Sequence, residues 1–507
     1  MHRICWQGLD KWTSEKKIAK FILEQFPEFT NCLLAKPPKK SYAFIDFPSS
    51  ESMSTFVEQM ETQTYKNRKI KLKPGSTQVK KKMRPLSDIL KPKEPVISEE
   101  PKPLGPIEDK VTPLWQESYS QQLLFKKQVV SEAYEKFRQD MDLACSKNTF
   151  LKPSWLKSPP EVREVQASPL TDSYRNKVEF NIGAGREGLT KVGFTNGQMA
   201  AGNLTIDSPK NCLNIPESSK VVAELVEEVV RASGIPPYNI KTHEGIWKQV
   251  TYRLSSRTGQ SMVIVQINPS DNQQLIEDLL VEKLSEHCST LLLQVLSTPP
   301  ILRILTGTGY ITEYILEKAF RISPLSFFQV NTIGCEVLYR NVLNEVEGDV
   351  LLDICCGTGS IGICCSEKVS KVIGVEIIPE AIADAQNNAE LNNVNAEFKV
   401  GKAEDLVREV CKDVEGKTIC GVVDPPRTGL QKTVLSALRT TKGLDKLVYV
   451  SCNPKSMFKD LLELCLPEHK KLRGPPFVVV SVQPVDMFPH TPHVECVVTL
   501  KRITALS

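Results

Sequence analysis

Three polar side chains in the C-terminal part of the chain lie where apolar segments begin or end. Asp424 closes the apolar run 419–424, and Cys452 follows the run 445–451. Glu495 lies at the start of the last apolar run, 493–500. A thiol can act as a nucleophile and a carboxylate as a general base. These residue types therefore suit covalent and acid–base chemistry.

Cys452 is the strongest candidate nucleophile in this set. A helix is expected to begin near Lys455, which would leave Cys452 exposed at its N-terminus. The positive end of a helix lowers the pKa of a thiol and favours the thiolate. The alternative is a buried structural thiol, as expected for most of the other 14 cysteines, and Glu495 could likewise be a surface carboxylate. His490 and His493 lack an evident third ligand, so a structural role is expected for them.

A second set of residues points to a nucleoside-containing cofactor. The stretch from Val350 to Glu376 holds an apolar run ending in Asp353, the turn Gly357-x-Gly359, a helix and a second apolar run. Glycines allow a tight turn and close approach of a ligand. An acid that closes the next strand can accept hydrogen bonds from ribose hydroxyls, which predicts that role for Glu376.

Alternating apolar and helical segments predict the scaffold for these residues. Apolar runs at 350–355, 371–375, 396–400, 419–424, 445–451, 477–483 and 493–500 predict seven strands, and the last two have no helix between them. This pattern is typical of a doubly wound α/β sheet that ends in an antiparallel hairpin. The carboxyl ends of such strands share one edge, where ligands bind.

Residues 3–73 follow a β-α-β-β-α-β pattern and resemble an RNA recognition motif, so we expect a ferredoxin-like domain over residues 1–74. Lys40–Phe47 resembles the longer RNA-contacting segment of that family, with Tyr42 and Phe44 where bases would stack. Ser41 and Cys5 depart from the family's usual glycine and aromatic. The alternative is a packing module that uses both rings partly as core.

The middle of the chain is predicted to connect and bind. Residues 75–112 are rich in Pro and Lys and read as a flexible linker. Residues 113–310 are predicted to form a long helix over 113–146 and an α+β RNA-binding domain, followed by the catalytic domain at 311–507. Arg175 and Lys177 are expected on one face of a strand, where they could hold phosphates or form a solvated surface.

Composition narrows the class of protein. Hydrophobic residues make up 41% and charged residues 24%, as in soluble globular proteins, and 11 Lys or Arg lie between Lys66 and Lys93. That run is either a solvated linker or a contact with a polyanion.

The 15 cysteines form no Cys-x-x-Cys pair, so we expect reduced thiols, no metal cluster and a cytosolic or nuclear protein. No apolar stretch reaches about 18 residues, so no membrane span is expected. Structured sequence is predicted almost from Met1, so the sequence leaves open whether the natural chain begins earlier.

The motifs together resemble the RNA uracil-5-methyltransferase family, specifically its members that make 5-methyluridine in tRNA. The resemblance spans residues 113–503 and rests on motifs in the family's order: Tyr174-Arg-Asn-Lys177, Phe327-Phe-Gln329, Gly357-x-Gly359, Asp424-Pro-Pro-Arg427, Ser451-Cys-Asn-Pro454 and His493-Val-Glu495. The four cysteines that hold an iron–sulfur cluster in bacterial rRNA enzymes of the family have no counterpart.

The resemblance implies a Rossmann-like catalytic domain that binds S-adenosylmethionine and methylates uridine C5, at T-loop position 54 of tRNA. Cys452 would add to C6 of the base, and Glu495 would remove the C5 proton. The resemblance also implies a monomer located in cytosol and nucleus. It places Gln329, Cys355, Gly357, Gly359, Glu376 and Asp424 around the cofactor, and Arg175, Lys177 and Arg427 on the RNA. Relatives often have an aromatic at the position of Cys355 and Asn at that of Ser360.

Several alternatives remain open from the sequence. The same chemistry could act on other RNAs, such as rRNA or mRNA, or the chain could serve as a non-catalytic tRNA-binding or tRNA-folding protein. A cytosine-5 methyltransferase would carry a second cysteine at the position of Arg427, and an amino-group methyltransferase an aromatic there. Arg427 argues against both.

Overall fold

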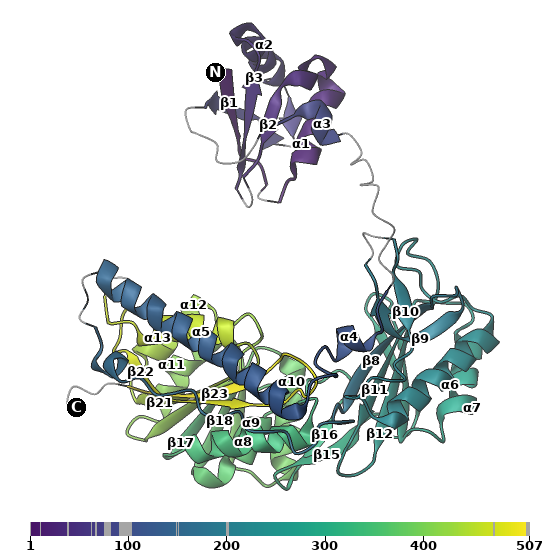
Figure 1. The fold of residues 1–507 in the computed structure, drawn as a ribbon, viewed down its shortest axis with the longest axis vertical. Coiled ribbons are helices and arrows are strands. Elements are labelled where there is room, and N and C mark those ends of the chain that lie inside the picture. The colour runs from purple at the N-terminus through teal and green to yellow at the C-terminus, as the bar shows by residue number, and fades with distance from the viewer. Residues whose placement is uncertain are drawn as a thin grey trace. The chain divides into compact units, whose positions relative to one another are not determined.

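The computed structural model divides the chain into two compact units, Met1–Lys102 and Pro103–Ser507 (Figure 1). The residues described are 2–10, 12–37, 40–61, 63–65, 68–75, 83–90, 104–148, 150, 152–198, 202–469 and 472–502.

The first unit is a five-stranded sheet covered on one face by two helices. The sheet has the order β6-β1-β3-β2-β7. Its hydrophobic core includes Trp6, Ile45 and Phe56, which are almost completely buried. The elements are β1 (His2–Gln7), α1 (Glu15–Gln25), β2 (Leu33–Ala35), β3 (Tyr42–Phe47), α2 (Ser50–Glu61), β4 (Thr64–Tyr65), β5 (Arg68–Lys69), β6 (Lys71–Pro74), β7 (Arg84–Pro85) and α3 (Leu86–Leu90), with a 3-10 turn at Pro27–Asn31.

Part of the predicted linker belongs to this unit. β7 pairs with β2, and Leu86 and Ile89 of α3 are 0% and 7% exposed. A linker over all of 75–112 is therefore wrong for residues 84–90, because two apolar side chains suffice to dock a short helix. The rest of the basic run at 76–82 and 91–93 lies outside the described residues.

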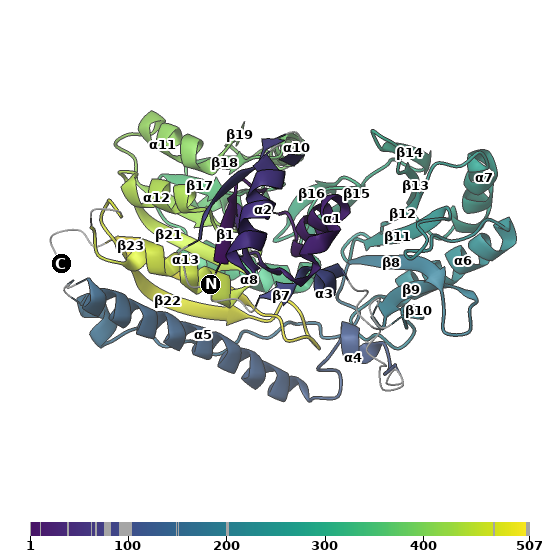
Figure 2. The same cartoon turned by 90° about the horizontal axis from the view of Figure 1, so that it is seen from above.

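The central part of the second unit is a seven-stranded sheet with the order β10-β9-β8-β11-β12-β13-β14. Figure 2 shows α6 and α7 together on one side of this sheet, where Trp247 and Val263 are fully buried. The elements are α4 (Glu108–Val111), β8 (Lys177–Ala184), β9 (Thr190–Asn196), β10 (Thr205–Asp207), α6 (Glu217–Ser233), β11 (Trp247–Leu254), β12 (Ser261–Ile267), α7 (Gln273–Leu284), β13 (Thr290–Val295) and β14 (Ile301–Thr306).

The C-terminal part is the expected doubly wound sheet, with the order β19-β18-β17-β20-β21-β23-β22. It belongs to the predicted catalytic domain and is named the catalytic sheet. Every neighbouring pair is parallel except β21–β23 and β22–β23, so the predicted terminal antiparallel hairpin is confirmed. The elements are β17 (Val350–Ile354), α9 (Ser360–Cys364), β18 (Lys371–Glu376), α10 (Pro379–Leu391), β19 (Ala396–Val400), α11 (Ala403–Asp413), β20 (Ile419–Val423), α12 (Lys432–Thr440), β21 (Leu444–Ser451), α13 (Pro454–Cys465), β22 (Phe477–Val485) and β23 (Glu495–Arg502), with a 3-10 turn at Ser366–Lys368.

The long helix α5 (Tyr119–Lys147) packs on the catalytic sheet rather than on the central one. Its buried stripe includes Val130, Tyr134 and Phe137, and the rings of the last two lie 5.3 and 5.6 Å from the ring of Phe458 in α13. Figure 2 shows α5 running along β22. The predicted boundary, which grouped this helix with residues 113–310, is wrong here because an amphipathic stripe does not specify its partner. A 3-10 turn at Ser154–Lys157 follows.

The hairpin β15 (Ile311–Ile315) and β16 (Lys318–Ile322) and the helix α8 (Thr332–Glu345) join the two sheets. One continuous core contains Ile264 of the central sheet, Phe320 of the hairpin, Leu338 of α8 and Leu351 of the catalytic sheet. The second unit therefore buries both sheets against the same connecting elements. Among the described residues, no helix combines the length and apolar character that a membrane span requires.

Candidate active site

Cys452 lies between β21 and α13, and its side chain is half-buried. The Ser451 hydroxyl accepts the Asn453 N–H at 3.1 Å, and Pro454 opens the helix. Burial and the Glu495 carboxyl raise the pKa of the Cys452 thiol, while the guanidinium of Arg427 opposes them. The predicted lowering of this pKa is therefore wrong, because the argument from the helix N-terminus ignored burial and the neighbouring acid.

Glu495 is buried at 4% exposure, so it is not a surface carboxylate. Its Oε2 atom has no hydrogen-bond partner. Burial and the neighbouring Asp424 raise the pKa of Glu495 well above its ordinary value, although the charge of Arg427 opposes this. A desolvated carboxyl with one unpartnered oxygen and a raised pKa is suited to take a proton from a bound substrate.

The turn after β17 forms an open cradle. Cys355, Gly357 and Gly359 all have positive φ angles, of 62°, 53° and 76°. A Cβ on Gly357 would meet nothing within 4 Å, whereas one on Gly359 would lie 2.8 Å from Phe398 Cζ. Gly357 thus leaves space for a ligand, and Gly359 permits close packing behind the turn. Burial raises the pKa of Cys355 to about 12, which does not suit a nucleophile.

Glu376 lies across this cradle at the end of β18. Its Oε2 atom accepts the Gly357 N–H at 3.2 Å, and its Oε1 atom accepts the N–H groups of Ile377 and Ile378 at 2.8 and 3.1 Å. The backbone therefore fixes the carboxylate beside the turn. This arrangement fits the expected role of Glu376 as a ribose acceptor.

Two more acids line the same sheet edge. Asp353 is fully buried, with Oδ2 accepting the Gly362 N–H at 2.9 Å and Oδ1 left without a partner. Burial raises the pKa of Asp353 to about 7. Asp424, one residue beyond β20, has its pKa raised by burial and by the charge of Asp353. An orphaned carboxylate oxygen and an open glycine turn fit a cofactor that carries hydroxyl and amino groups.

Arg427 joins the loops that carry Asp424 and Cys452. Its carbonyl accepts Asn453 Nδ2 at 3.0 Å and the Ser456 hydroxyl at 2.9 Å. Its exposed side chain acts on both Cys452 and Glu495. The cation expected on the RNA is thus also the charge that favours the Cys452 thiolate.

The two predicted cations near residue 176 have different surroundings. Arg175 precedes β8 rather than lying within it, and burial lowers its pKa, with Arg427 close enough to contribute. Lys177 opens β8 and pairs with Glu179 at 2.6 Å. The prediction that both lie in one strand is wrong, because the backbone N–H of Arg175 bonds to Asn214 instead of a neighbouring strand. Arg175 therefore lies near Arg427, while Lys177 is partly neutralised by Glu179.

Gln329 and the two aromatic residues of the first unit complete the set of predicted residues. Gln329 is 8% exposed and precedes α8. In the first unit, Tyr42 is half-buried and its ring lies 5.4 Å from that of Phe44. Phe44 is only 7% exposed, with Arg3 over its ring and paired with Asp46. Phe44 therefore presents little surface for stacking.

The sequence reasoning missed a set of polar contacts, a buried grip from α5 on the loop that leads to Glu495. Lys126 of α5 and Asp486 form a fully buried ion pair at 2.5 Å, and Lys126 also donates to the Phe488 carbonyl at 2.9 Å. Gln122, one turn earlier, accepts the His490 N–H at 2.7 Å. The signal was two polar residues at helical spacing within an otherwise apolar stripe.

The central domain joins the same loop from the other side. The Tyr174 hydroxyl donates to the Pro489 carbonyl at 3.0 Å, and His490 Nε2 lies 2.7 Å from Asp172 Oδ1. Because a carboxylate oxygen accepts, His490 Nε2 is the donor in the contact with Asp172. His490 is thus a structural link, as expected. No group of three His, Cys, Asp or Glu among the described residues could hold a metal ion.

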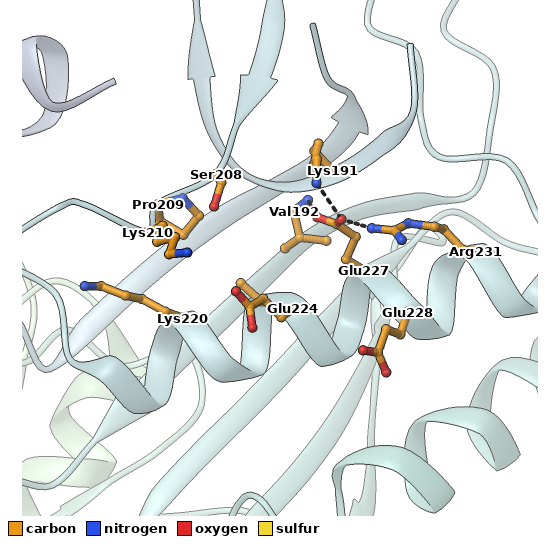
Figure 3. Close-up of a pocket in the computed structure, with 11 residues that line it drawn as sticks. Lys191, Val192, Ser208, Pro209, Lys210, Lys220, Glu224, Glu227, Glu228 and Arg231 are labelled. Atoms are coloured by element: carbon orange, nitrogen blue, oxygen red, sulfur yellow. Dashed lines mark hydrogen bonds and ion pairs between the residues drawn. The ribbon is translucent and has the colours of Figure 1, made fainter. Parts of the chain in front are cut away.

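A separate cavity of about 250 Å³ lies on the central domain (Figure 3). The Glu227 carboxylate inside it accepts Lys191 Nζ at 2.9 Å and the Val192 N–H at 3.1 Å, and it pairs with Arg231. The figure shows these cations turned toward Glu227. The contacts of Glu227 therefore hold α6 on β9, and this cavity lies apart from the site at the catalytic sheet edge.

The sequence profile of the family described as tRNA (Uracil-5-)-methyltransferase matches residues 139–503. The chain belongs to this family. A human relative named tRNA (uracil-5-)-methyltransferase homolog A is 33% identical, over 93% of this chain and 78% of its own length. Homolog B of Pongo abelii is 35% identical, over 79% of this chain and 90% of its own. The family expected from the motifs is thereby confirmed.

A solved structure agrees with this assignment. The Pyrococcus abyssi tRNA (uracil-54, C5)-methyltransferase in complex with S-adenosyl-L-homocysteine is 26% identical, with a TM-score of 0.60 over 77% of this chain and 84% of that one. As a member of the family, the chain is an S-adenosylmethionine-dependent methyltransferase. The RNA recognition motif profile matches residues 7–71, which confirms the class of the first unit.

Proposed function

We propose that the chain methylates C5 of uridine in tRNA, at T-loop position 54, through a covalent bond between Cys452 and C6. The observation that carries this proposal is the register of β21 and β23. Ser451 pairs with Cys496; Cys452 directly follows Ser451 at the end of β21, and Glu495, the first residue of β23, directly precedes Cys496. The two residues therefore lie at one edge of the sheet, close enough for the Glu495 charge to act on the Cys452 thiol. A nucleophile and a base at one edge can act on one ring.

The chemistry needs both groups. Uracil C5 is a poor nucleophile until a thiolate adds to C6 and places negative charge on C5 and O4. Bound S-adenosylmethionine supplies the electrophilic methyl group. Glu495 then takes the proton from C5, and the electrons of that C–H bond re-form the C5–C6 double bond and expel the Cys452 thiolate.

The other side chains bind and orient. Glu376 would hold the ribose of the cofactor, with Gly357 and Gly359 allowing the backbone to approach its amino-acid end. Asp424 and Gln329 are proposed to complete that contact, and Cys355 lies at the same turn. Arg175 and Arg427, both close enough to act on His493, would hold RNA phosphates.

The RNA must present its uridine outside the helical stack, because Glu495 is buried and Cys452 is half-buried. We propose that Tyr42 of the first unit and Lys177 of the second unit add RNA contacts. The P. abyssi enzyme is named for uracil 54 of tRNA, and this supports the choice of nucleotide. We also propose that the protein acts in cytosol and nucleus.

The experiment is methyl transfer to an unmodified tRNA transcript with labelled cofactor, followed by nucleoside analysis. The wild type should yield 5-methyluridine, and a transcript with cytidine at position 54 should yield none. Cys452→Ala should abolish the product. Cys288→Ala, at another half-buried thiol, should not. Label in another nucleoside, or activity of Cys452→Ala, would overturn the proposal.

A further inference from the structure

Asn176 holds the Gln329 loop through main-chain atoms. Its side-chain Nδ2 donates to the Gln329 carbonyl at 3.0 Å and to the Thr332 hydroxyl at 2.8 Å. Its backbone N–H donates to the Val330 carbonyl at 2.8 Å. Two successive residues of the loop are thus fixed by one residue of the central domain.

The hydrogen-bond chain continues to Glu313, a carboxylate with 0% exposure in β15. The Thr332 hydroxyl donates to it at 2.8 Å. The hydroxyls of Ser255 and Ser256 donate at 2.9 and 3.0 Å, and the N–H groups of Ser256 and Arg257 at 2.8 and 3.2 Å. The turn between β11 and β12 is therefore connected to the Gln329 loop by buried hydrogen bonds.

The donors and acceptors in this chain allow only one direction. Asn176 uses its two amide hydrogens on Gln329 and Thr332, and this leaves the hydrogen of the Thr332 hydroxyl for Glu313. Loss of the hydroxyl would leave a buried donor on Asn176 unsatisfied and would remove the bond of this hydrogen-bond chain that links Asn176 to Glu313. A fully satisfied buried network resists displacement, whereas a partly satisfied one does not.

The loop held in this way borders the catalytic acids. Asn331, the N-cap of α8, donates to the Met487 carbonyl at 3.0 Å in the segment that leads to Glu495. Cys335, in the first turn of α8, lies close enough to Asp424 and Glu495 for both charges to raise its pKa. A shift of the loop would therefore move groups at the reacting centre.

We infer that Asn176, Thr332 and Glu313 are positioning residues that hold Gln329 in its working orientation. They act through Gln329 and connect the central domain to the methyl-transfer site by buried hydrogen bonds. This inference rests on the proposed function, and it adds residues to which no role in the reaction has been assigned above. Displacement of a positioned group by about 1 Å can slow a reaction about a hundredfold.

The test is a double-mutant cycle on the single-turnover rate at saturating tRNA and cofactor. Thr332→Val keeps the shape and removes the hydroxyl, and it should slow the reaction about tenfold or more. In a Gln329→Ala background the same change should have no further effect, because the positioned group is gone. Thr332→Ser should remain within about twofold of wild type, since it restores the hydroxyl.

Thr499 supplies the matched control, because it is fully buried in β23 and its hydroxyl has no partner. Thr499→Val should leave the rate unchanged. Independent slowing by Thr332→Val and Gln329→Ala, multiplied in the double variant, would overturn the inference. If Thr332→Val does not fold, Asn176→Asp, which turns a donor into an acceptor, enters the same cycle with the same criterion. A wild type that forms no 5-methyluridine would overturn the proposed function instead.

Discussion

Cys452 directly follows Ser451, and Glu495 directly precedes Cys496, at the pair Ser451–Cys496 that ends the ladder between β21 and β23. The two side chains therefore extend from one sheet edge, and each acts on the ionisation of its surroundings. Glu495 raises the pKa of the Cys452 thiol, while Arg427 lowers the pKa of both groups. Burial and Glu495 thus disfavour the thiolate form of Cys452, and the pH dependence of the reaction tests this.

The rate of methyl transfer should rise with pH. The pKa values of Cys452 and Glu495 are both raised, and both groups act in their deprotonated forms. Single-turnover rates at low tRNA concentration should therefore increase from about pH 6 to about pH 9. A flat or falling profile over this range would contradict the assignment of the two groups.

Arg427→Gln should raise the pKa of Cys452 further, because it removes the cation that favours the thiolate. The variant should be slower than wild type by about tenfold near pH 7, with the gap narrowing as the pH rises. Arg427→Lys keeps the charge and serves as the control. A gap that is constant with pH would instead indicate a role in RNA binding alone.

Lys126→Met should destabilise the second unit strongly, because it leaves Asp486 buried without its cation. The expected loss is about 3–5 kcal/mol in the free energy of unfolding, measured by urea denaturation. Lys127→Met, one residue along, breaks the ion pair with the exposed Glu164, and its loss should be below about 1 kcal/mol. Similar losses for the two variants would contradict the buried grip.

Gly357→Ala should separate ligand binding from folding. The added methyl meets no protein atom, so only the positive φ opposes it, at a cost of about 1–2 kcal/mol. The affinity for S-adenosyl-L-homocysteine, measured by calorimetry, should fall about tenfold or more if the cofactor occupies this space. Unchanged affinity would place the cofactor elsewhere.

Tyr42→Ala and Phe44→Ala should have different effects on the first unit. Because Tyr42 is half-buried, Tyr42→Ala should lower the affinity for an unstructured RNA oligonucleotide by about fivefold or more, with little loss of stability. Because Phe44 is buried, Phe44→Ala should mainly lower the free energy of unfolding, by about 3 kcal/mol. Equal RNA binding by wild type and Tyr42→Ala would remove Tyr42 from the contact surface.

Local patterns predicted the catalytic sheet well. The spacing from Asp353 through Gly357 and Gly359 to Glu376 depends on one strand–turn–helix–strand unit, which a single stretch of sequence contains. The placement of Cys452 and Glu495 at one edge followed from the same alternation, because strands in such a sheet end together.

Long-range relations were not predictable in the same way. The pKa of Cys452 depends on Arg427 and Glu495, which come from other loops, so the helix N-terminus alone gave the wrong direction. The partner of α5 was misplaced because its stripe fits any apolar surface. The role of Asn176 rests on contacts with Gln329 and Thr332, more than 150 positions away, and no local pattern marks it.

The central claim is that Cys452 forms a covalent bond to the target uridine, and it is tested most directly by mass spectrometry on a trapped complex. A tRNA with 5-fluorouridine at position 54 gives Glu495 no C5 proton to remove, so the adduct cannot resolve by elimination. Incubation with S-adenosylmethionine should add the mass of a methylated nucleotide to the peptide that contains Cys452. Methyl transfer without an adduct, or an adduct on Cys355 or Cys356, would contradict the account.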